Sequence, residues 1–271
     1  MNIIACYNIK GGVGKTASAV NLAFLAAREG AKVLLWDLDP QGASSFYYRI
    51  EPKVKSSRSA SMLRQKATIS SFIESTKYPR LDIIPADYSI RNIDLLLNTG
   101  RHSERRLSKL LSNLIGQYDY IFLDCPPTTS LLSDNIFHSS DILLVPTIPT
   151  TLSLRTLRQI ISIQAEAENA PRLITFFTMV DRRKTMHRLV VDRPPNLKAN
   201  ILGTSIPYAA EIERMGNERK PLHTFANASH PAKAYEALWL ELKAEIYQQQ
   251  ETKKAEQYEQ FEQENTLEPM L

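Results

Sequence analysis

A glycine-rich segment near the start of the chain restricts its fold more than any other stretch. Lys10-Gly11-Gly12-Val13-Gly14-Lys15-Thr16 follows the apolar run Ile3–Tyr7 and precedes a helix-like stretch that ends at Gly30. A strand, a glycine-rich loop and a helix in this order form a cradle for phosphate groups, because the loop N–H groups and the helix N-terminus both attract anions. In such a cradle Lys15 reaches the β- and γ-phosphate oxygens and Thr16 holds Mg²⁺. The segment therefore predicts a nucleotide-binding α/β protein.

The loop departs from the usual phosphate-loop pattern at its entrance. That pattern has a glycine five residues before Gly14, where this chain has Ile9, and a second lysine, Lys10, follows. A loop that already holds its phosphates through Lys15 needs no second ammonium from the same chain. We therefore expect Lys10 to point out of its own site, toward a nucleotide that is bound by another copy of the protein.

Two carboxylates follow the second expected strand, at the sheet edge where ligands bind in doubly wound folds. Asp37 and Asp39 stand at alternate positions, so their side chains point the same way in an extended segment. We expect Asp39, which lies beyond the strand, to approach Mg²⁺ or the attacking water. Asp37 is better placed to anchor the loop, or to anchor Thr16 and its metal-bound water. A strand-end turn that is merely capped by Asp is the alternative.

A third carboxylate, Asp124, follows the four-residue apolar run Tyr120–Leu123 of a later expected strand. An apolar strand that ends in Asp is the usual form of the acid that supports Mg²⁺ in phosphate-loop enzymes, here through a water molecule. Two prolines then stiffen the exit toward Thr128 and Thr129, which are placed to sense a γ-phosphate. Alone this pattern is weak, but it comes third after the loop and the first acid pair.

Apolar runs alternate with helical patterns, which predicts a doubly wound, mostly parallel sheet flanked by helices. The expected strands are 2–7, 32–37, 81–85, 118–124, 141–146, 172–180 and 201–206, and the expected helices are 16–29, 103–116, 129–138, 151–168 and 232–248. The basic, serine-rich segment 51–69 is expected to be a loop or short helix inserted at the sheet edge. We expect one domain over residues 1–249 and an acidic polar tail over 250–271, frayed or disordered.

Charge and cysteine content narrow the function classes. The net charge is +4, but the tail holds six glutamates against two lysines, which leaves +8 on the rest of the chain. A basic body with an acidic tail suggests a polyanionic partner. No apolar run approaches the ~20 residues of a membrane-spanning helix, and no signal peptide is apparent. Cys6 and Cys125 fall in expected buried strand or strand-end positions, which favours a cytoplasmic protein.

Taken together, Lys10–Thr16, Asp37–Gly42 and Asp124–Pro127 resemble the deviant Walker box of the ParA/MinD ATPases. The similarity is greatest to the Soj-like ParA proteins, which partition DNA or position other cargo. It covers roughly residues 1–245 and continues through further matching segments: Val145-Pro146-Thr147, Thr178–Arg182, Ile206-Pro207 and Lys220-Pro221-Leu222. The resemblance implies a P-loop NTPase that forms an ATP sandwich dimer, in which Lys10 crosses to the phosphates of the partner.

Further roles follow from the same resemblance. It implies that the catalytic residues are Lys10, Lys15 and Asp39. It implies that Thr16 and Asp39 hold Mg²⁺, that Asp124 contacts the ion through water, and that Asp37 lies behind the direct ligands. The residues that it implies for ATP binding are Gly11, Gly12, Val13, Gly14, Lys15, Thr16, Ala17, Asp181 and Pro207. Asp181 and Pro207 are the expected adenine contacts. Two positions depart from the family pattern: Ala17 replaces a usual hydroxyl residue, and the segment 208–211 lacks the basic residues that many relatives have there.

The sequence leaves three uses of ATP open. A DNA-binding ATPase is favoured by the basic run 181–198, in which a dimer would double weak phosphate contacts. The expected DNA contacts are Arg182, Arg183, Lys184 and Arg188, the alternative is a solvated helix face, and His187 in this run is expected at the surface. A MinD-like membrane-cycling ATPase is the second use, but it needs a basic amphipathic tail, so no membrane contact is expected. A metabolic relative, such as a nitrogenase-type iron protein or a ligase-like synthetase, is the third use. An iron–sulfur version needs paired cysteines across a dimer axis, but Cys6 precedes the phosphate loop and Cys125 follows the second acid, and no small-substrate pocket motif is apparent.

By resemblance, the partners are a second copy that joins on ATP, non-specific DNA, and a ParB-like or other adaptor that stimulates hydrolysis. We accordingly expect a cytoplasmic, nucleoid-associated protein. The sequence does not identify the cargo, which in such systems is a plasmid, a chromosome, a carboxysome or a chemosensory cluster.

Overall fold

The computed structural model describes residues 1–51, 68–86, 94, 97–98, 103–167 and 170–266, and side chains up to Thr252. Its strands form one sheet in the order β3-β4-β2-β5-β1-β6-β7-β8. They are β1 (Asn2–Cys6), β2 (Val33–Asp37), β3 (Glu74–Ser75), β4 (Leu81–Ile84), β5 (Tyr120–Asp124), β6 (Ile142–Thr147), β7 (Arg172–Phe177) and β8 (Asn200–Ile201). Every neighbouring pair is parallel except β3 and β4. The predicted doubly wound, mostly parallel sheet is therefore confirmed.

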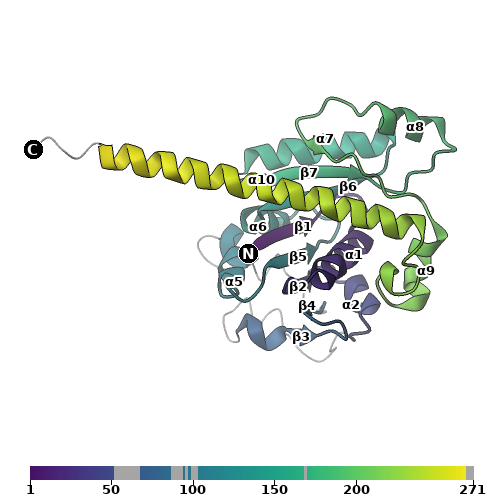
Figure 1. Ribbon diagram of the computed structural model, residues 1–271, viewed down its shortest axis with the longest axis horizontal. Helices are drawn as coiled ribbons and strands as arrows, with labels where there is room; N and C mark the ends of the chain where they lie inside the picture. Colours follow the sequence, from purple (N-terminus) through teal and green to yellow (C-terminus); the bar gives the residue numbers. More distant parts are fainter. Residues whose placement is uncertain (52–67, 87–93, 95–96, 99–102, 168–169, 267–271) are drawn as a thin grey trace, which may run out of the picture.

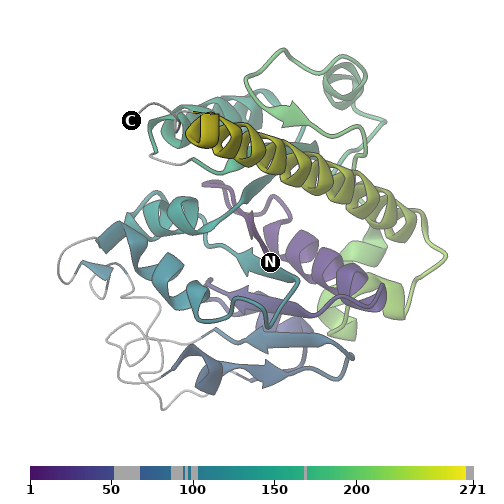
Figure 2. The same cartoon turned by 60° about the vertical axis from the view of Figure 1, so that its left-hand side comes forward.

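Helices cover both faces of the sheet, as Figures 1 and 2 show. The α-helices are α1 (Lys15–Arg28), α2 (Ala43–Tyr47), α5 (Arg106–Ser112), α6 (Leu131–Ser139), α7 (Thr151–Glu166), α8 (Thr185–Asp192), α9 (Ala210–Glu218) and α10 (His230–Thr266). Short 3-10 helices are η1 (Ile69–Phe72), η3 (Ser103–Arg105) and η4 (Leu222–Thr224). Helices α1 and α10 pack on one face, and α5, α6 and α7 pack on the other.

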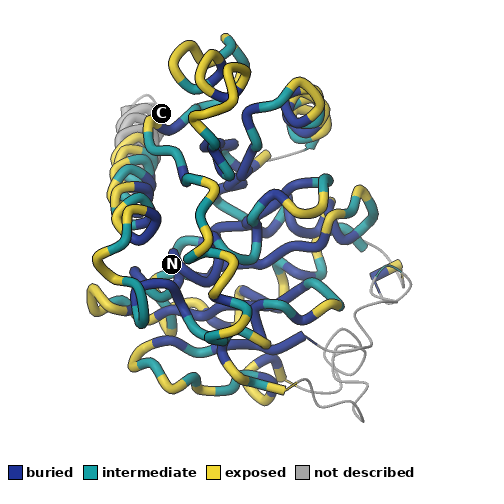
Figure 3. Tube along the Cα trace, turned by 90° about the vertical axis from the view of Figure 1, so that its right-hand side faces the viewer, coloured by how far each residue is buried: buried dark blue, intermediate teal, exposed yellow. Residues whose placement is uncertain are grey.

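The strand side chains divide the core into two layers. In β1, Ile3 and Ala5 join the apolar cluster beneath α5 and α6, whereas Ile4 and Cys6 join the cluster beneath α1 and α10. This alternation is the two-residue period of a strand, and both layers are buried because helices cover both faces. Figure 3 shows the resulting distribution, with buried strands inside and exposed residues on the loops and outer helix surfaces.

Several elements differ from the sequence-based expectation. Strand β7 ends at Phe177 instead of residue 180, and β8 has two residues instead of the expected 201–206. The cause near β8 is that the N–H groups of Gly203 and Thr204 bind the side chain of Glu241 and not a neighbouring strand. The elements β3, α2, α8 and α9 were not expected. Helix α10 continues past the expected 232–248, and its second half extends away from the sheet (Figure 1).

The expected insert falls largely outside the described part of the chain. Residues 52–67 of the segment 51–69 lie outside the described residues, and the chain is described again from Thr68, where it leads into η1 and the edge strand β3. Among the described helices, none is long and apolar enough to cross a membrane.

Candidate nucleotide-binding site

The glycine-rich loop joins the central strand β1 to the N-terminus of α1. Gly12 and Gly14 take φ angles of 69° and 87°, in the left-handed region that favours glycine. A Cβ on Gly14 would also lie 3.2 Å from the Thr178 hydroxyl oxygen, so space as well as conformation requires glycine there. No side chain caps the start of α1 at Gly14. Its first-turn N–H groups, including that of Ala17, therefore suit an anion such as a phosphate.

Lys15 lies along the inside of this loop. Its side-chain nitrogen donates a hydrogen bond to the carbonyl oxygen of Lys10, at 3.2 Å, and the residue is buried. Burial lowers the pKa of the Lys15 ammonium, and the nearby Asp124 carboxylate opposes that shift. An ammonium that has lost much of its hydration inside a loop of N–H groups fits the position of a phosphate ligand.

Two buried carboxylates meet at the carboxyl edge of the sheet. Asp37 ends β2, Asp124 ends β5, and the two residues stand opposite each other in adjacent strands. Asp124 accepts hydrogen bonds from the hydroxyls of Thr16, at 3.2 Å, and Ser44, at 2.5 Å. Burial raises the pKa of Asp124 to about 6, and burial with the Asp124 charge raises that of Asp37 to about 8. A cation beside Thr16 would favour the charged forms of both acids.

Asp37 holds the turn that carries Asp39. Its carboxylate accepts hydrogen bonds from the Ser45 N–H, at 2.8 Å, the Ser45 hydroxyl, at 2.7 Å, and the Asp39 N–H, at 3.3 Å. Of the two predicted roles, the structure therefore supports the loop anchor, because Thr16 is bound by Asp124. Asp39 is half-buried beyond the strand, and its carboxylate accepts the Gln41 N–H at 2.9 Å.

Two serines of this turn were not among the predicted site residues. Ser44 and Ser45 are fully buried and connect the acids of β2 and β5 to the start of α2. The Ser45 hydroxyl also accepts the Ala86 N–H at 2.9 Å, which ties the turn to the segment after β4. The available signal was the pair of hydroxyl residues just after Gly42, which takes a φ of 67° at the start of α2.

The donor set fits a magnesium ion that is completed by a nucleotide. In the described part of the chain, no group of three or more His, Cys, Asp or Glu side chains is arranged to hold a metal ion. Mg²⁺ in nucleotide sites takes several of its ligands from phosphate and water. Thr16 fits as a direct protein ligand, and Asp124 behind it fits a contact through water.

Lys10 points out of its own loop. Its side-chain nitrogen donates to the Ser153 hydroxyl in the first turn of α7, at 3.1 Å, and that oxygen also accepts the Thr150 hydroxyl at 3.2 Å. Its backbone N–H is held by the Asn8 side chain at 2.9 Å. The predicted direction of Lys10 agrees with this geometry, but the contact with α7 was not foreseen. Its contact with a second copy stays a prediction.

The two predicted adenine residues, Asp181 and Pro207, lie on the segments that follow β7 and β8. The Val180 N–H donates to the Ile206 carbonyl and the Tyr208 N–H to the Val180 carbonyl, both at 3.0 Å, so Pro207 is paired with Val180. Asp181 is already engaged, because both its oxygens accept from the Arg183 guanidinium at 2.9 and 3.0 Å. These bonds lower the pKa of Asp181 to about 2.

The four predicted DNA contacts are all exposed, on the segment that leads into and through α8. They are Arg182, Arg183, Lys184 and Arg188. Arg182 forms an ion pair with Asp192 at 3.1 Å, and Arg183 forms one with Asp181. Arg188 donates to two uncharged acceptors, the Arg182 carbonyl and the Thr185 hydroxyl. The two aspartates therefore reduce the positive field of Arg182 and Arg183 more than that of Lys184 and Arg188.

The expectation of a surface His187 was wrong. The residue is only 4% exposed, and its Nδ1 accepts the Asp181 N–H at 3.1 Å. It stands three residues before Val190, so both face the interior from the same side of α8. His187 is therefore part of the support of the Asp181 turn.

Comparisons with known proteins agree with this geometry. A protein-family model described as an AAA domain matches residues 1–173. The sporulation initiation inhibitor protein Soj of Bacillus subtilis (strain 168) is 30% identical over 239 residues, which cover 86% of this chain and 94% of Soj. A putative plasmid partition protein from Borrelia burgdorferi B31, bound to AMPPNP, has a TM-score of 0.76 at 23% identity and covers 90% of this chain and 99% of its own. The cobyrinic acid a,c-diamide synthase of Mycobacterium smegmatis, with a bound ATP analogue and magnesium, has a TM-score of 0.68 at 27% identity and covers 84% and 93%.

Proposed function

Because the chain belongs to the ParA/Soj family, we propose that it is an ATPase that dimerises on ATP and Mg²⁺, binds DNA without sequence preference, and leaves the DNA after hydrolysis. The observation that carries this proposal is the different placement of the two lysines of the loop. Lys15 lies within the loop, whereas the Lys10 ammonium lies outside it on α7. One lysine is thus sufficient for the phosphates of its own site, and the other is available to a second site.

Each residue of the site then has a defined task. The N–H groups of the loop and of α1, with Lys15, bind the phosphates. Thr16, held by Asp124, would hold a Mg²⁺ ion, which would supply positive charge beside the phosphates. Asp39 orients the attacking water, and Asp37 keeps Asp39 in place through the turn. When two protomers close, each Lys10 neutralises the charge that develops on the phosphate of its partner, in a site from which water is excluded.

DNA binding depends on the dimer in this proposal. The basic segment 182–188 gives each protomer a few phosphate contacts, which are weak alone and additive when two copies are held together. ATP therefore switches attachment to the nucleoid on. A ParB-like or other adaptor on the cargo stimulates hydrolysis and so switches it off. The segment 250–271 is negatively charged and would be repelled by an anionic membrane surface, which disfavours a membrane as the alternative partner.

The dimer is tested with Lys10→Ala and, as a control, Lys109→Ala, which removes an exposed lysine from α5 on another part of the protein. Lys10→Ala is expected to bind Mg-ATP but to stay monomeric by light scattering, and to lose DNA binding and stimulated hydrolysis. The control is expected to match the wild type in all assays. Full turnover by a monomeric Lys10→Ala protein would contradict the role of Lys10 in the partner site.

The DNA surface is tested on the two basic residues that have no acidic partner described above. The double variant Lys184→Ala/Arg188→Ala is compared with Lys109→Ala/Lys233→Ala, which removes the same charge from exposed positions elsewhere. Without two cations on each protomer, the slope of log affinity against log salt is expected to flatten by about 3 to 4 for the dimer, since each phosphate neutralised by the protein adds about 0.9 to that slope. An unchanged slope in the first variant would place the DNA surface on another part of the protein.

The partner and the cargo are tested with Asp39→Ala. Without the residue that orients the attacking water, the ATP-bound dimer is expected to persist and to remain on DNA. Proteins that co-purify with this variant in ATP, but not in ADP, would include the adaptor. A monomeric Asp39→Ala protein in ATP would contradict the assigned role of Asp39.

A further inference from the structure

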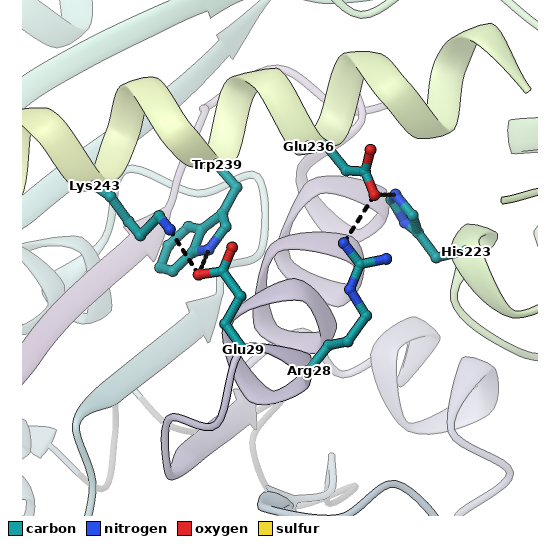
Figure 4. A network of polar contacts seen from close by, with 6 residues as sticks. All are labelled: Arg28, Glu29, His223, Glu236, Trp239 and Lys243. Atoms are coloured by element: carbon teal, nitrogen blue, oxygen red, sulfur yellow. Dashed lines mark hydrogen bonds and ion pairs between the residues drawn. The ribbon is translucent and has the colours of Figure 1, made fainter. Parts of the chain in front are cut away.

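Helix α10 is fastened to the helix that follows the phosphate loop. Figure 4 shows α10 crossing α1, with two acidic residues between them. Glu236 of α10 pairs with Arg28 of α1 at 2.8 Å. Glu29, just after α1, accepts hydrogen bonds from the Trp239 indole nitrogen at 3.0 Å and from Lys243 at 2.6 Å. These contacts fix α10 to the C-terminal end of α1, the helix whose N-terminal end carries the phosphate loop.

The same helix also binds the loop after β8. One carboxylate oxygen of Glu241 accepts the N–H groups of Gly203, at 2.8 Å, and Thr204, at 3.3 Å, and the other oxygen accepts the Thr204 hydroxyl. Successive N–H groups that converge on one oxygen form a strong anion contact, because donors and charge act together. Glu241 thus replaces the strand pairing that this loop lacks.

This loop leads directly to the predicted adenine contact. It is bound to β7 at two points, where the Leu202 N–H donates to the Thr175 carbonyl and the Ile206 N–H to the Phe177 carbonyl, both at 2.8 Å. The two residues held by Glu241 lie between these points, and Pro207 follows directly after the second. Pro207 is also paired with Val180, so Glu241, by holding residues 203–204, adds to this pairing in setting the position of Pro207.

We propose that Glu241 is a positioning residue for the base of the bound nucleotide. Through it, α10, which is fixed to the C-terminal end of α1, connects the helix that begins at the phosphate loop with the loop before Pro207. The inference rests on the proposed function, because it takes the site to bind ATP with its base at Pro207. It assigns a specific consequence to Glu241: the base contact depends on it, and the triphosphate contact does not.

The experiment compares Glu241→Ala, Glu241→Gln and the control Glu236→Ala, which loosens α10 from α1 without touching the base loop. Affinities for Mg-ATP and for Mg-tripolyphosphate, which has no base, are measured by calorimetry, together with KM, kcat and the melting temperature. In Glu241→Ala the affinity for Mg-ATP is expected to fall about tenfold, which is at the lower end of the range usually found when one site affects binding at another. The affinity for tripolyphosphate is expected to change by less than about twofold. KM should rise with kcat unchanged, which is the sign of lost ground-state binding.

The conservative variant separates positioning from general loosening. The amide oxygen of Glu241→Gln still accepts the Gly203 N–H, so this variant is expected to recover most of the ATP affinity. An equal loss for ATP and tripolyphosphate, or the same selective loss in Glu236→Ala, would overturn the inference. So would an unchanged ATP affinity in Glu241→Ala. If the wild type binds tripolyphosphate but gains nothing from adenosine, the base site at Pro207 is absent and the inference falls with it. Failure of the wild type to bind either compound would overturn the proposed function as well.

Discussion

The hydrogen bond between Lys10 and Ser153 makes a quantitative prediction about dimer formation. In the single protomer the Lys10 ammonium is held on α7 by the Ser153 hydroxyl, at 3.1 Å. In the proposed dimer Lys10 leaves this position for the phosphates of the partner. The bond therefore stabilises the monomer against the dimer, and its removal by Ser153→Ala is expected to tighten ATP-dependent dimerisation.

The size of this effect follows from the geometry. A hydrogen bond with a charged partner contributes roughly 1.5–3 kcal/mol when buried, and a half-buried ammonium such as Lys10 gains less, about 1 kcal/mol. Both protomers lose the bond on closing, so it opposes dimerisation by about 2 kcal/mol, or about 30-fold in the dimer dissociation constant. Ser153 is 1% exposed, and alanine keeps its packing while it removes the acceptor.

Sedimentation equilibrium in a non-hydrolysable ATP analogue measures the dimer constant directly. The matched control is Thr150→Ala, because the Thr150 hydroxyl also donates to Ser153 but does not contact Lys10. This control is expected to leave the dimer constant within about twofold of the wild type, since it removes no bond to a charged group. In a Lys10→Ala background, Ser153→Ala should not restore dimerisation, because there is no ammonium to release to the partner. A dimer constant that is unchanged or weaker in Ser153→Ala would refute the reasoning.

Three further outcomes are expected. Gly14→Ala should lower the melting temperature more than Gly12→Ala. Both glycines have left-handed φ angles, but only a Cβ at Gly14 would meet the Thr178 hydroxyl, at 3.2 Å. Adding Thr178→Ala should therefore raise the melting temperature of Gly14→Ala but not that of Gly12→Ala. Burial lowers the pKa of His223 below its unfolded value of about 6.5, so the unfolded chain takes up more protons below that pH. His223 should accordingly oppose stability as the pH drops below about 6.5, whereas the raised pKa values of Asp37 and Asp124 act in the opposite direction in wild type and variant alike. The change in melting temperature from pH 7.5 to 5.5 should therefore be less favourable in the wild type than in His223→Gln. Both cysteines are fully buried with raised pKa values, so Cys6 and Cys125 should resist alkylation by iodoacetamide at pH 8 until the protein unfolds. Modification of either thiol in the native protein would contradict this.

The sequence was enough to predict the positions of those site residues that lie in one continuous segment or at the end of a strand. The phosphate loop is a continuous segment with its own strand and helix, so its position could be predicted at once. Asp37 and Asp124 are far apart along the chain, but each ends an apolar run, and parallel strands bring their carboxyl ends to one edge. Strand-end acids in such a fold can therefore be placed together without knowing any contact between them.

Other parts depend on contacts that no local pattern records. Ser44 looks like an ordinary turn residue until β5 brings Asp124 within 2.5 Å of its hydroxyl. The expected strand 201–206 has suitable residues, but Glu241, on a distant helix, takes the N–H groups that a strand would use. His187 lies in a basic run, and only the orientation of α8 buries it against the Asp181 turn. In each case a tertiary partner outweighed the local preference.

The length of α10 has a further consequence for how the protein meets a polyanion. The last 15 residues of the helix span about 20 Å at ~1.5 Å per residue, and they belong to a segment that holds six glutamates against two lysines. In Figure 1 this end points away from the molecule on the side opposite α8, which contains Arg188 and follows Arg182 and Arg183. The two segments therefore form an electric dipole across the molecule. In the field of a duplex such a dipole exerts a torque that turns the arginine side forward before contact, and added salt weakens this alignment.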